Sequence, residues 1–306
     1  KTLTVTLNNA SVTKEYDGTR DAPAGFAPSY TVSGYVTGDS AATLTFVDAL
    51  YNSKDVATAT TITVSGLAVD SVTGTLGSAA TDYQVSQADP TVAATITAKP
   101  ITFSATKVYD GMLDLTGDVS IVGLIADESL VISGALASDE NVATTDKFIA
   151  SLSVTDGIGG LKSNYDIPHI RNATNAPVTI TPADLTVTAA NDAKLKDQSD
   201  STGYAGALYN GFVNGETVTA LGDTLAIVRT NDAEEVGTYA GVLKPSGLTS
   251  TNYTITFESG DYTIVGRDTL LLRSTATGTQ EYGGTPSYTF ASAQYLNSSD
   301  QVIDLS

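Results

Sequence analysis

Lys14-Glu15-Tyr16-Asp17-Gly18-Thr19 recurs later in the chain as Lys107-Val108-Tyr109-Asp110-Gly111-Met112. A degenerate form occurs at Gln280-Glu281-Tyr282-Gly283-Gly284-Thr285. Between them, Lys194-Leu195-Lys196-Asp197 holds the equivalent place without the tyrosine. The four segments are spaced by roughly 90 residues, and self-similarity at a fixed period indicates tandem modules.

Three further landmarks keep the same order inside each of the first three copies. They are an acidic turn at Asp39, Glu128 and Glu216, a Val-Ala-Thr or Val-Gly-Thr step at Val56, Val142 and Val236, and a closing pair at Asp82-Tyr83, Asn164-Tyr165 and Asn252-Tyr253. The fourth copy begins near Asp268 and reaches Ser306 before its later landmarks. We therefore expect modules at residues 1–99, 100–183 and 184–267, and a partial module at residues 268–306.

Inside each copy, Thr or Ser alternates with aliphatic residues, as in Leu3-Thr4-Val5-Thr6-Leu7 and Leu185-Thr186-Val187-Thr188. Such alternation predicts half-buried strands, and turn-forming clusters interrupt it about every 8–12 residues. The sequence therefore predicts an all-β protein of tandem small antiparallel β-sandwich modules, either Ig-like or grasp-like. Because the gaps between modules are short and two contain proline (Pro100 and Pro182), we expect stiff joints and an elongated rod.

The composition excludes several classes of protein. Among the 306 residues, 34 are acidic and 15 are basic, which gives a formal net charge of −19. This balance argues against binding to nucleic acid, because few side chains could neutralise phosphates. No apolar run reaches the roughly 18 residues of a membrane-spanning segment, so membrane insertion is not expected. The chain has no cysteine, which excludes disulfides and thiol chemistry.

The landmarks resemble those of the YDG and MBG (mostly-beta, glycine-rich) repeats of large bacterial surface proteins. Tyr16-Asp17-Gly18 and Tyr109-Asp110-Gly111 match the YDG signature, and Val236-Gly237-Thr238-Tyr239 and Asn252-Tyr253-Thr254 look like the MBG closing pattern. Tyr282-Gly283-Gly284-Thr285-Pro286 resembles the MBG opening. The resemblance implies YDG-type modules at 1–99 and 100–183 and MBG-type modules from residue 184 onward. It also implies secreted adhesins or filamentous haemagglutinin-like proteins of the bacterial cell surface, in which such repeats act as extracellular stalks.

Each Tyr-Asp-Gly segment has a structural interpretation as a tight turn. Glycine takes the positive-φ position, aspartate caps the turn amides, and tyrosine packs on the sheet. The turn residues under this interpretation are Tyr16, Asp17, Gly18, Tyr109, Asp110, Gly111, Tyr282 and Gly283. The third copy departs from the pattern because Lys196 stands where the tyrosine is expected.

We expect no bound cofactor; the one candidate is calcium, since it binds oxygen ligands from loops and could stiffen the joints of acidic stalk modules. The candidate ligands are Asp17, Asp184, Asp197 and Asp268, but none of them lies in a recognised calcium-binding loop. The favoured interpretation of the acidic side chains is a solvated surface that keeps the protein soluble.

We do not expect an enzyme. The single histidine is His169, and no nucleophile elbow or phosphate-binding loop occurs. The leading hypothesis is a non-catalytic spacer of an adhesin or biofilm matrix protein, whose partners are neighbouring repeats of the same protein. One alternative is an adhesive module that binds host or matrix glycans through exposed tyrosines, with Tyr204, Tyr209 and Tyr288 as candidates, or that binds the same protein on other cells. Another is a fibre subunit whose fourth module is completed by strand donation.

Overall fold

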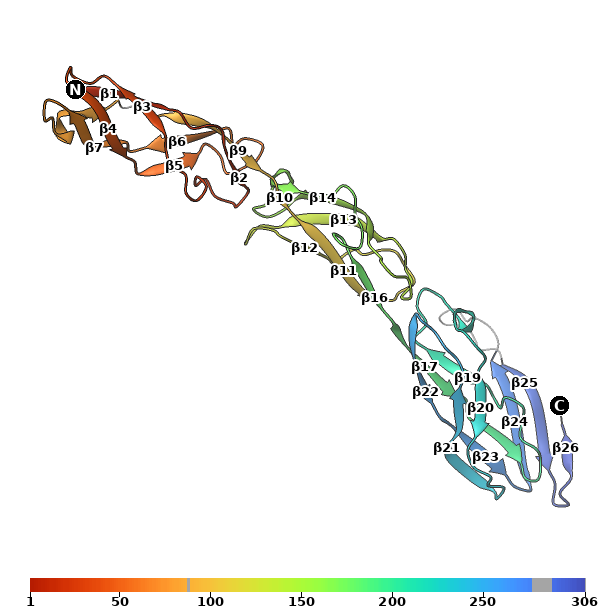
Figure 1. Cartoon of the computed structure of the whole chain (residues 1–306). Helices are drawn as coiled ribbons and strands as arrows, with labels where there is room; N and C mark the ends of the chain where they lie inside the picture. Colours follow the sequence, from red (N-terminus) through yellow and green to blue (C-terminus); the bar gives the residue numbers. More distant parts are fainter. Residues whose placement is uncertain (87–88, 277–287, 306) are drawn as a thin grey trace. The chain divides into compact units, whose positions relative to one another are not determined.

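The computed structural model describes residues 1–86, 89–276 and 288–305, and the predicted all-β fold is confirmed. The helical content of these residues is limited to three short 3-10 turns, at Ala80–Asp82, Lys162–Asn164 and Val218–Ala220. None of the described helical segments has the length and apolarity needed to span a membrane. The chain forms small sheets that follow the repeat found in the sequence (Figure 1).

The chain divides into two compact units. The first comprises Lys1–Thr106, Leu113–Asp139 and Thr145–Thr179, and the second comprises Lys107–Met112, Glu140–Thr144 and Ile180–Ser306. The second Tyr-Asp-Gly turn therefore belongs to the second unit, together with the third and fourth copies. Each unit is described by itself.

In the first unit, the first copy forms three sheets, ordered β3-β1-β8, β4-β7 and β2-β9-β6-β5. Its strands are β1 (Thr2–Leu7), β2 (Val12–Glu15), β3 (Tyr30–Ser33), β4 (Asp39–Thr45), β5 (Asp48–Tyr51), β6 (Thr61–Ser65), β7 (Ala68–Gly74), β8 (Gln84–Val85) and β9 (Thr91–Thr97). The second copy forms the sheets β12-β11-β16, β13-β14 and β10-β15. Its strands are β10 (Lys99–Pro100), β11 (Thr102–Val108), β12 (Val119–Val122), β13 (Leu130–Ala137), β14 (Ile149–Asp156), β15 (Tyr165–Asp166) and β16 (Val178–Thr181).

In the second unit, the third copy forms two sheets, ordered β19-β17-β22 and β18-β23-β21-β20. Its strands are β17 (Ala183–Ala189), β18 (Asp192–Leu195), β19 (Ala207–Asn210), β20 (Ala226–Arg229), β21 (Gly237–Ser246), β22 (Tyr253–Glu258) and β23 (Gly260–Val265). The fourth copy contributes an antiparallel sheet of β24 (Thr269–Ala276), β25 (Tyr288–Leu296) and β26 (Val302–Asp304).

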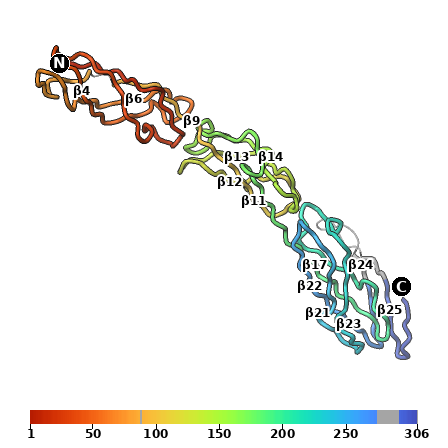
Figure 2. The backbone as a smooth tube through the Cα atoms, in the orientation of Figure 1, coloured from red at the N-terminus to blue at the C-terminus, as the bar shows by residue number. Residues whose placement is uncertain are grey.

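The short joint between the third and fourth copies predicted that they stack end to end. The fourth copy instead packs beside the third. Leu195 at the end of β18 pairs with Val265, just before the turn into β24. Further along β24, the Arg273 guanidinium lies 2.6 Å from Asp192 at the start of β18 and also donates to the Ala193 carbonyl. β24 therefore runs back along β18, and Figure 2 shows β24 and β25 alongside the third copy.

The sequence predicted antiparallel sheets, and β4-β7, β13-β14 and β24-β25-β26 are antiparallel. Other sheets contain parallel pairs. In the first copy β1 pairs in parallel with β8 and β2 with β9, and in the third copy β17 pairs in parallel with β22 and β18 with β23. In a module whose chain enters at one end and leaves at the other, the first and last strands run in the same direction. When such strands are neighbours in a sheet, they can pair only in parallel.

The threonine-aliphatic alternation sorts side chains between core and solvent. In β9, threonine or alanine at the exposed positions alternates with buried Val92, Ala94 and Ile96. Other fully buried side chains are Leu3, Ile62, Phe103, Leu185 and Ile264. Period-2 patterning therefore gives each of the first three copies a core without cysteine.

Candidate functional site: the tyrosine joints

The first Tyr-Asp-Gly turn is closed by a buried lysine. The Lys14 ammonium donates to Asp17 Oδ1 at 2.7 Å and to the Asp21 carbonyl at 2.8 Å. Asp17 also accepts the Thr19 amide at 2.9 Å, and Gly18 has φ of +79°. Partial burial acts to raise the pKa of the Asp17 carboxyl, but the hydrogen bonds from Lys14 and Thr19 lower it below its ordinary value.

The second turn repeats this arrangement. The Lys107 ammonium donates to Asp110 Oδ1 at 2.6 Å, and Asp110 accepts the Met112 amide at 3.0 Å. Gly111 has φ of +69°. Each turn is therefore a rigid element, fixed by an ion pair within it and by a glycine in the left-handed region.

The tyrosine of each turn leaves its own sheet and contacts the next copy along the chain. In the first unit, the hydroxyls of Tyr16 and Tyr165 both donate to Glu128, each at 2.6 Å and each to a different carboxylate oxygen. The two rings meet edge to face with centroids 5.6 Å apart. We call Tyr16, Glu128 and Tyr165 the first clasp.

The second unit contains the same arrangement. Tyr109 donates to Glu216 Oε1 at 2.6 Å, Tyr253 donates to Glu216 Oε2, and the ring centroids lie 5.5 Å apart in an edge-to-face contact. We call Tyr109, Glu216 and Tyr253 the second clasp. Burial and the hydrogen bond to glutamate raise the pKa of Tyr109, Tyr253 and Tyr16, and they raise the pKa of Tyr165 to about 12. The phenols are therefore held in their neutral, donating form.

A buried asparagine adds a second connection to each joint. Asn164 is fully buried; its Oδ1 accepts the Val56 amide at 2.9 Å, and its Nδ2 donates to Asp55 at 3.0 Å. In the second unit, Asn252 accepts the Val142 amide at 2.9 Å and donates to Asn141 at 2.9 Å. The Val-Ala-Thr step and the closing Asn-Tyr pair of the sequence are thus the two sides of one contact.

The two joints differ in charge. In the first, the Lys54 ammonium lies 3.2 Å from the Tyr16 hydroxyl and 3.8 Å from Glu128. In the second copy, Glu140 holds the position of Lys54. The carboxylate of the first clasp therefore has a nearby cation that the second clasp lacks at this position.

A glycine that the sequence reasoning missed precedes the acidic landmark of each of the first three copies, two of which receive a tyrosine joint there. Gly34, Gly123 and Gly211 precede the acidic turns and have φ of +97°, +104° and +121°. A Cβ at these positions would lie within 3 Å of a backbone carbonyl oxygen of the copy's first strand. The repeated glycine five residues before the acidic landmark is the sequence signal that could have found it.

The third copy has no clasp at its own turn within the described residues. The Lys196 amide donates to the Val265 carbonyl, as the Tyr16 amide does to Thr97, so Lys196 takes the tyrosine's place. Beside it, Asp200 accepts ion-pair contacts from Lys194 and Arg229 at 2.9 and 3.1 Å. The Arg229 guanidinium also lies over the Tyr262 ring, 4.9 Å from its centroid. A charge network thus replaces the phenol.

The other candidates from the sequence do not form a site together. Asp17 is in its ion pair, Asp184 is exposed on β17, Asp197 has φ of +66°, and Asp268 accepts the Tyr295 hydroxyl at 3.0 Å. In the described part of the chain, no group of three or more His, Cys, Asp or Glu side chains is arranged to hold a metal ion. The calcium candidates are therefore not brought together.

The tyrosines proposed for sugar stacking are not exposed as predicted. Tyr204 packs edge to face on Tyr262 and donates to Asp200, and Tyr209 packs on Phe212 with centroids 5.7 Å apart. Both are half-buried because each ring serves the packing of its own module. The side chain of Tyr288, and the predicted turn residues Tyr282 and Gly283, lie outside the described residues.

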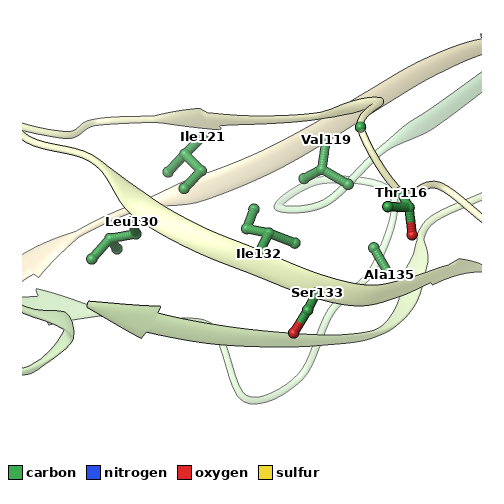
Figure 3. A pocket seen from close by; sticks show the side chains of 8 residues that line it. Thr116, Val119, Ile121, Leu130, Ile132, Ser133 and Ala135 are labelled. Atoms are coloured by element: carbon green, nitrogen blue, oxygen red, sulfur yellow. The ribbon is translucent and has the colours of Figure 1, made fainter. Parts of the chain in front are cut away.

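A groove of about 240 Å³ opens between β12 and β13 in the second copy. Val119 and Ile121 line one side, and Leu130, Ile132 and Ser133 line the other (Figure 3). In the first copy, Tyr30 holds the position of Val119, and its hydroxyl exchanges hydrogen bonds with the Leu44 backbone. The groove is therefore the space that an aromatic ring fills in the first copy.

Comparison with known protein families agrees with the landmarks. The YDG domain model matches residues 1–92, and the model of the MBG domain (YGX type) matches residues 185–263. Searches of curated proteins and of solved structures give no significant match. The chain therefore carries a YDG domain and an MBG domain in one tandem array.

Proposed function

We propose that this chain is a non-catalytic spacer, a stretch of stalk modules from a secreted bacterial adhesin or biofilm matrix protein. Its role is to hold an adhesive region away from the cell surface. The observation that carries the proposal is the recurrence of one joint: the same tyrosine, glutamate, tyrosine and asparagine contacts occur in both units.

The repeated joint suits a spacer because it opposes bending between consecutive modules. Each clasp uses both oxygens of one carboxylate, so a hinge motion that moves one tyrosine away breaks a charge-assisted hydrogen bond. The buried Asn164 opposes the same motion. If the two copies moved apart, its side-chain carbonyl would lose the Val56 amide and its side-chain amide would lose Asp55. A flexible tether would need neither feature.

The extracellular location is part of the proposal and rests on the family match and the composition. YDG and MBG domains resemble surface-protein repeats, and a net charge of −19 favours a soluble, non-associating stalk. Tyr204 and Tyr209, the described candidates for glycan stacking, are committed to packing within their module, which favours a spacer over a lectin.

Joint stiffness can be measured within the first unit. The chain has no cysteine, so Thr45→Cys and Ser120→Cys place two spin labels uniquely, one on the exposed face of each of the first two copies. We expect a narrow distance distribution that broadens when Tyr16→Phe and Glu128→Gln are combined. A Tyr239→Phe control removes an exposed hydroxyl of the other unit and should leave the distribution unchanged. A distribution already broad in the parent chain would contradict the spacer function.

A further inference from the structure

A hollow of about 300 Å³ in the second copy gathers basic side chains in an otherwise acidic chain. Lys162, His169 and Arg171 line it together with Leu152, Ser153 and Ile167, and no carboxylate lines it. The Arg171 guanidinium donates to backbone carbonyls, and no ion pair with a carboxylate involves Lys162 or Arg171 in the described part of the chain. The side chains that line this hollow are therefore basic or uncharged, in a protein of net charge −19.

The hollow exists because the chain leaves the sheet early. In the third copy the strand after the closing tyrosine runs from Tyr253 to Glu258, but in the second copy it ends at Asp166. Pro168 follows, and a proline removes an amide donor and restricts the residue before it. Residues 167–171 consequently form a loop, on which Ile170 is 82% exposed.

The same hollow lies along an unpaired strand edge. In the described structure β14 has one partner strand, β13. On its other side, the Ile149 amide bonds to Ala176, and Arg171 donates to the carbonyls of Ile149 and Ala150. Beyond these contacts, Leu152–Val154 presents an open edge beside Lys162 and His169, and an open edge is a template for another strand.

We propose that this hollow binds an extended acidic peptide segment, which adds a strand to the Leu152–Val154 edge of β14. Main-chain hydrogen bonds to the edge supply affinity, and alternate acidic side chains meet Lys162 and His169. Arg171 already uses three donors on backbone carbonyls, so it holds the loop against the edge and contributes positive charge. Lys162, Ile167 and His169 also line an adjoining hollow, together with Asp156 and Asp166.

The experiment uses the full chain and a short, acetylated and amidated peptide in which glutamate alternates with valine. We expect saturable binding that protects the amides of residues 152–154 from hydrogen exchange and that weakens as salt is added. The matched peptide with glutamine in place of glutamate should bind about tenfold more weakly. The double variant Lys162→Gln, His169→Gln should lose a similar factor, whereas Lys244→Gln, a charge removal in the third copy, should bind as the parent does.

Two results would overturn the proposal. Equal affinity for the glutamate and glutamine peptides would show that the basic residues do not select the ligand. Binding of D-glucuronate as tight as that of the peptide, without amide protection at residues 152–154, would identify an acidic-sugar site and exclude strand addition.

Discussion

Tyr16 and Tyr165 lie in different copies of the repeat, and their hydroxyls donate hydrogen bonds to the two oxygens of the Glu128 carboxylate. The same relationship joins Tyr109 and Tyr253 at Glu216. A carboxylate that accepts two phenols cannot keep both when the two copies rotate apart. The joint therefore stabilises one arrangement of consecutive copies, and its parts can be tested one at a time.

Removing the Tyr16 hydroxyl should weaken the first joint measurably. Tyr16→Phe keeps the ring contact with Tyr165 but deletes a hydrogen bond to a charged acceptor, which typically contributes about 2 kcal/mol. We expect native-state hydrogen exchange to show faster opening at Val56 and Ile125, whose amides bond across or beside the joint. Tyr239→Phe deletes an exposed hydroxyl bonded to a backbone carbonyl and should change stability by less than about 0.5 kcal/mol. Equal effects of the two substitutions would refute a special role for the clasp.

A methyl group at Gly18 should cost more than the backbone conformation alone explains. Gly18 and Gly25 have nearly the same φ, +79° and +81°, so alanine at either position carries the left-handed penalty of about 1–2 kcal/mol. At Gly25 the new Cβ meets open space, whereas at Gly18 it lies 3.1 Å from Ile125 Cγ2 of the next copy. We expect Gly18→Ala to destabilise the first unit by about 1 kcal/mol more than Gly25→Ala in chemical denaturation. The difference between the variants measures the joint contact, and a zero difference would show that the joint yields freely.

The sequence predicted the strands and the turns well because both depend on local patterns. Alternation places Val92 and Ile96 on one face of β9, and glycine after aspartate gives the left-handed residue of each turn. The tyrosine was only partly understood, since its packing surface was expected on its own sheet. Its actual partner, Glu128, lies in another copy, and no local pattern reports a contact over such a separation.

A signal for the joint was nevertheless present in the comparison of copies. The second and third copies each follow a copy that contains a Tyr-Asp-Gly turn. Both have glutamate at the acidic landmark and asparagine before the closing tyrosine. The first copy has Asp39 and Asp82 at these positions, and there the Tyr83 hydroxyl bonds Asp39 within its own module. The fold-back of β24 had no such signal, because the contacts of Arg273 with Asp192, Ala193 and Ser201 join residues far apart in the sequence.

The first clasp should lose its contribution to stability at high pH, over a range set by the pKa values of its tyrosines. Burial, together with the hydrogen bond to Glu128, raises the pKa of Tyr165 from 10.0 to about 12. The folded state therefore holds this proton more tightly than the unfolded state. The contribution to stability is complete below pH 10 and is lost as the pH rises through 12.

Phenolate absorption and denaturation midpoints should report this loss together. Glu128→Gln keeps a hydrogen-bond acceptor and removes the negative charge, so it should lower the pKa of Tyr165 and also that of Tyr16. The late part of the tyrosine titration should then move toward lower pH. An unchanged titration in this variant would mean that burial alone, and not the shared carboxylate, sets these pKa values.

Filling the groove of the second copy should stabilise it. Val119 holds the position at which Tyr30 bridges β3 and β4 in the first copy, and Ser133 corresponds to Leu44, whose backbone that tyrosine contacts. Val119→Tyr places a ring against Ile121 and Ile132 and brings a hydroxyl to the Ser133 backbone, so we expect a gain of about 1 kcal/mol, typical of cavity filling. Val119→Phe supplies the ring without the hydroxyl and should recover only part of the gain. Hydrogen exchange measures the outcome. If both variants destabilise the first unit, the groove between β12 and β13 is too narrow for an aromatic ring, and the prediction is wrong.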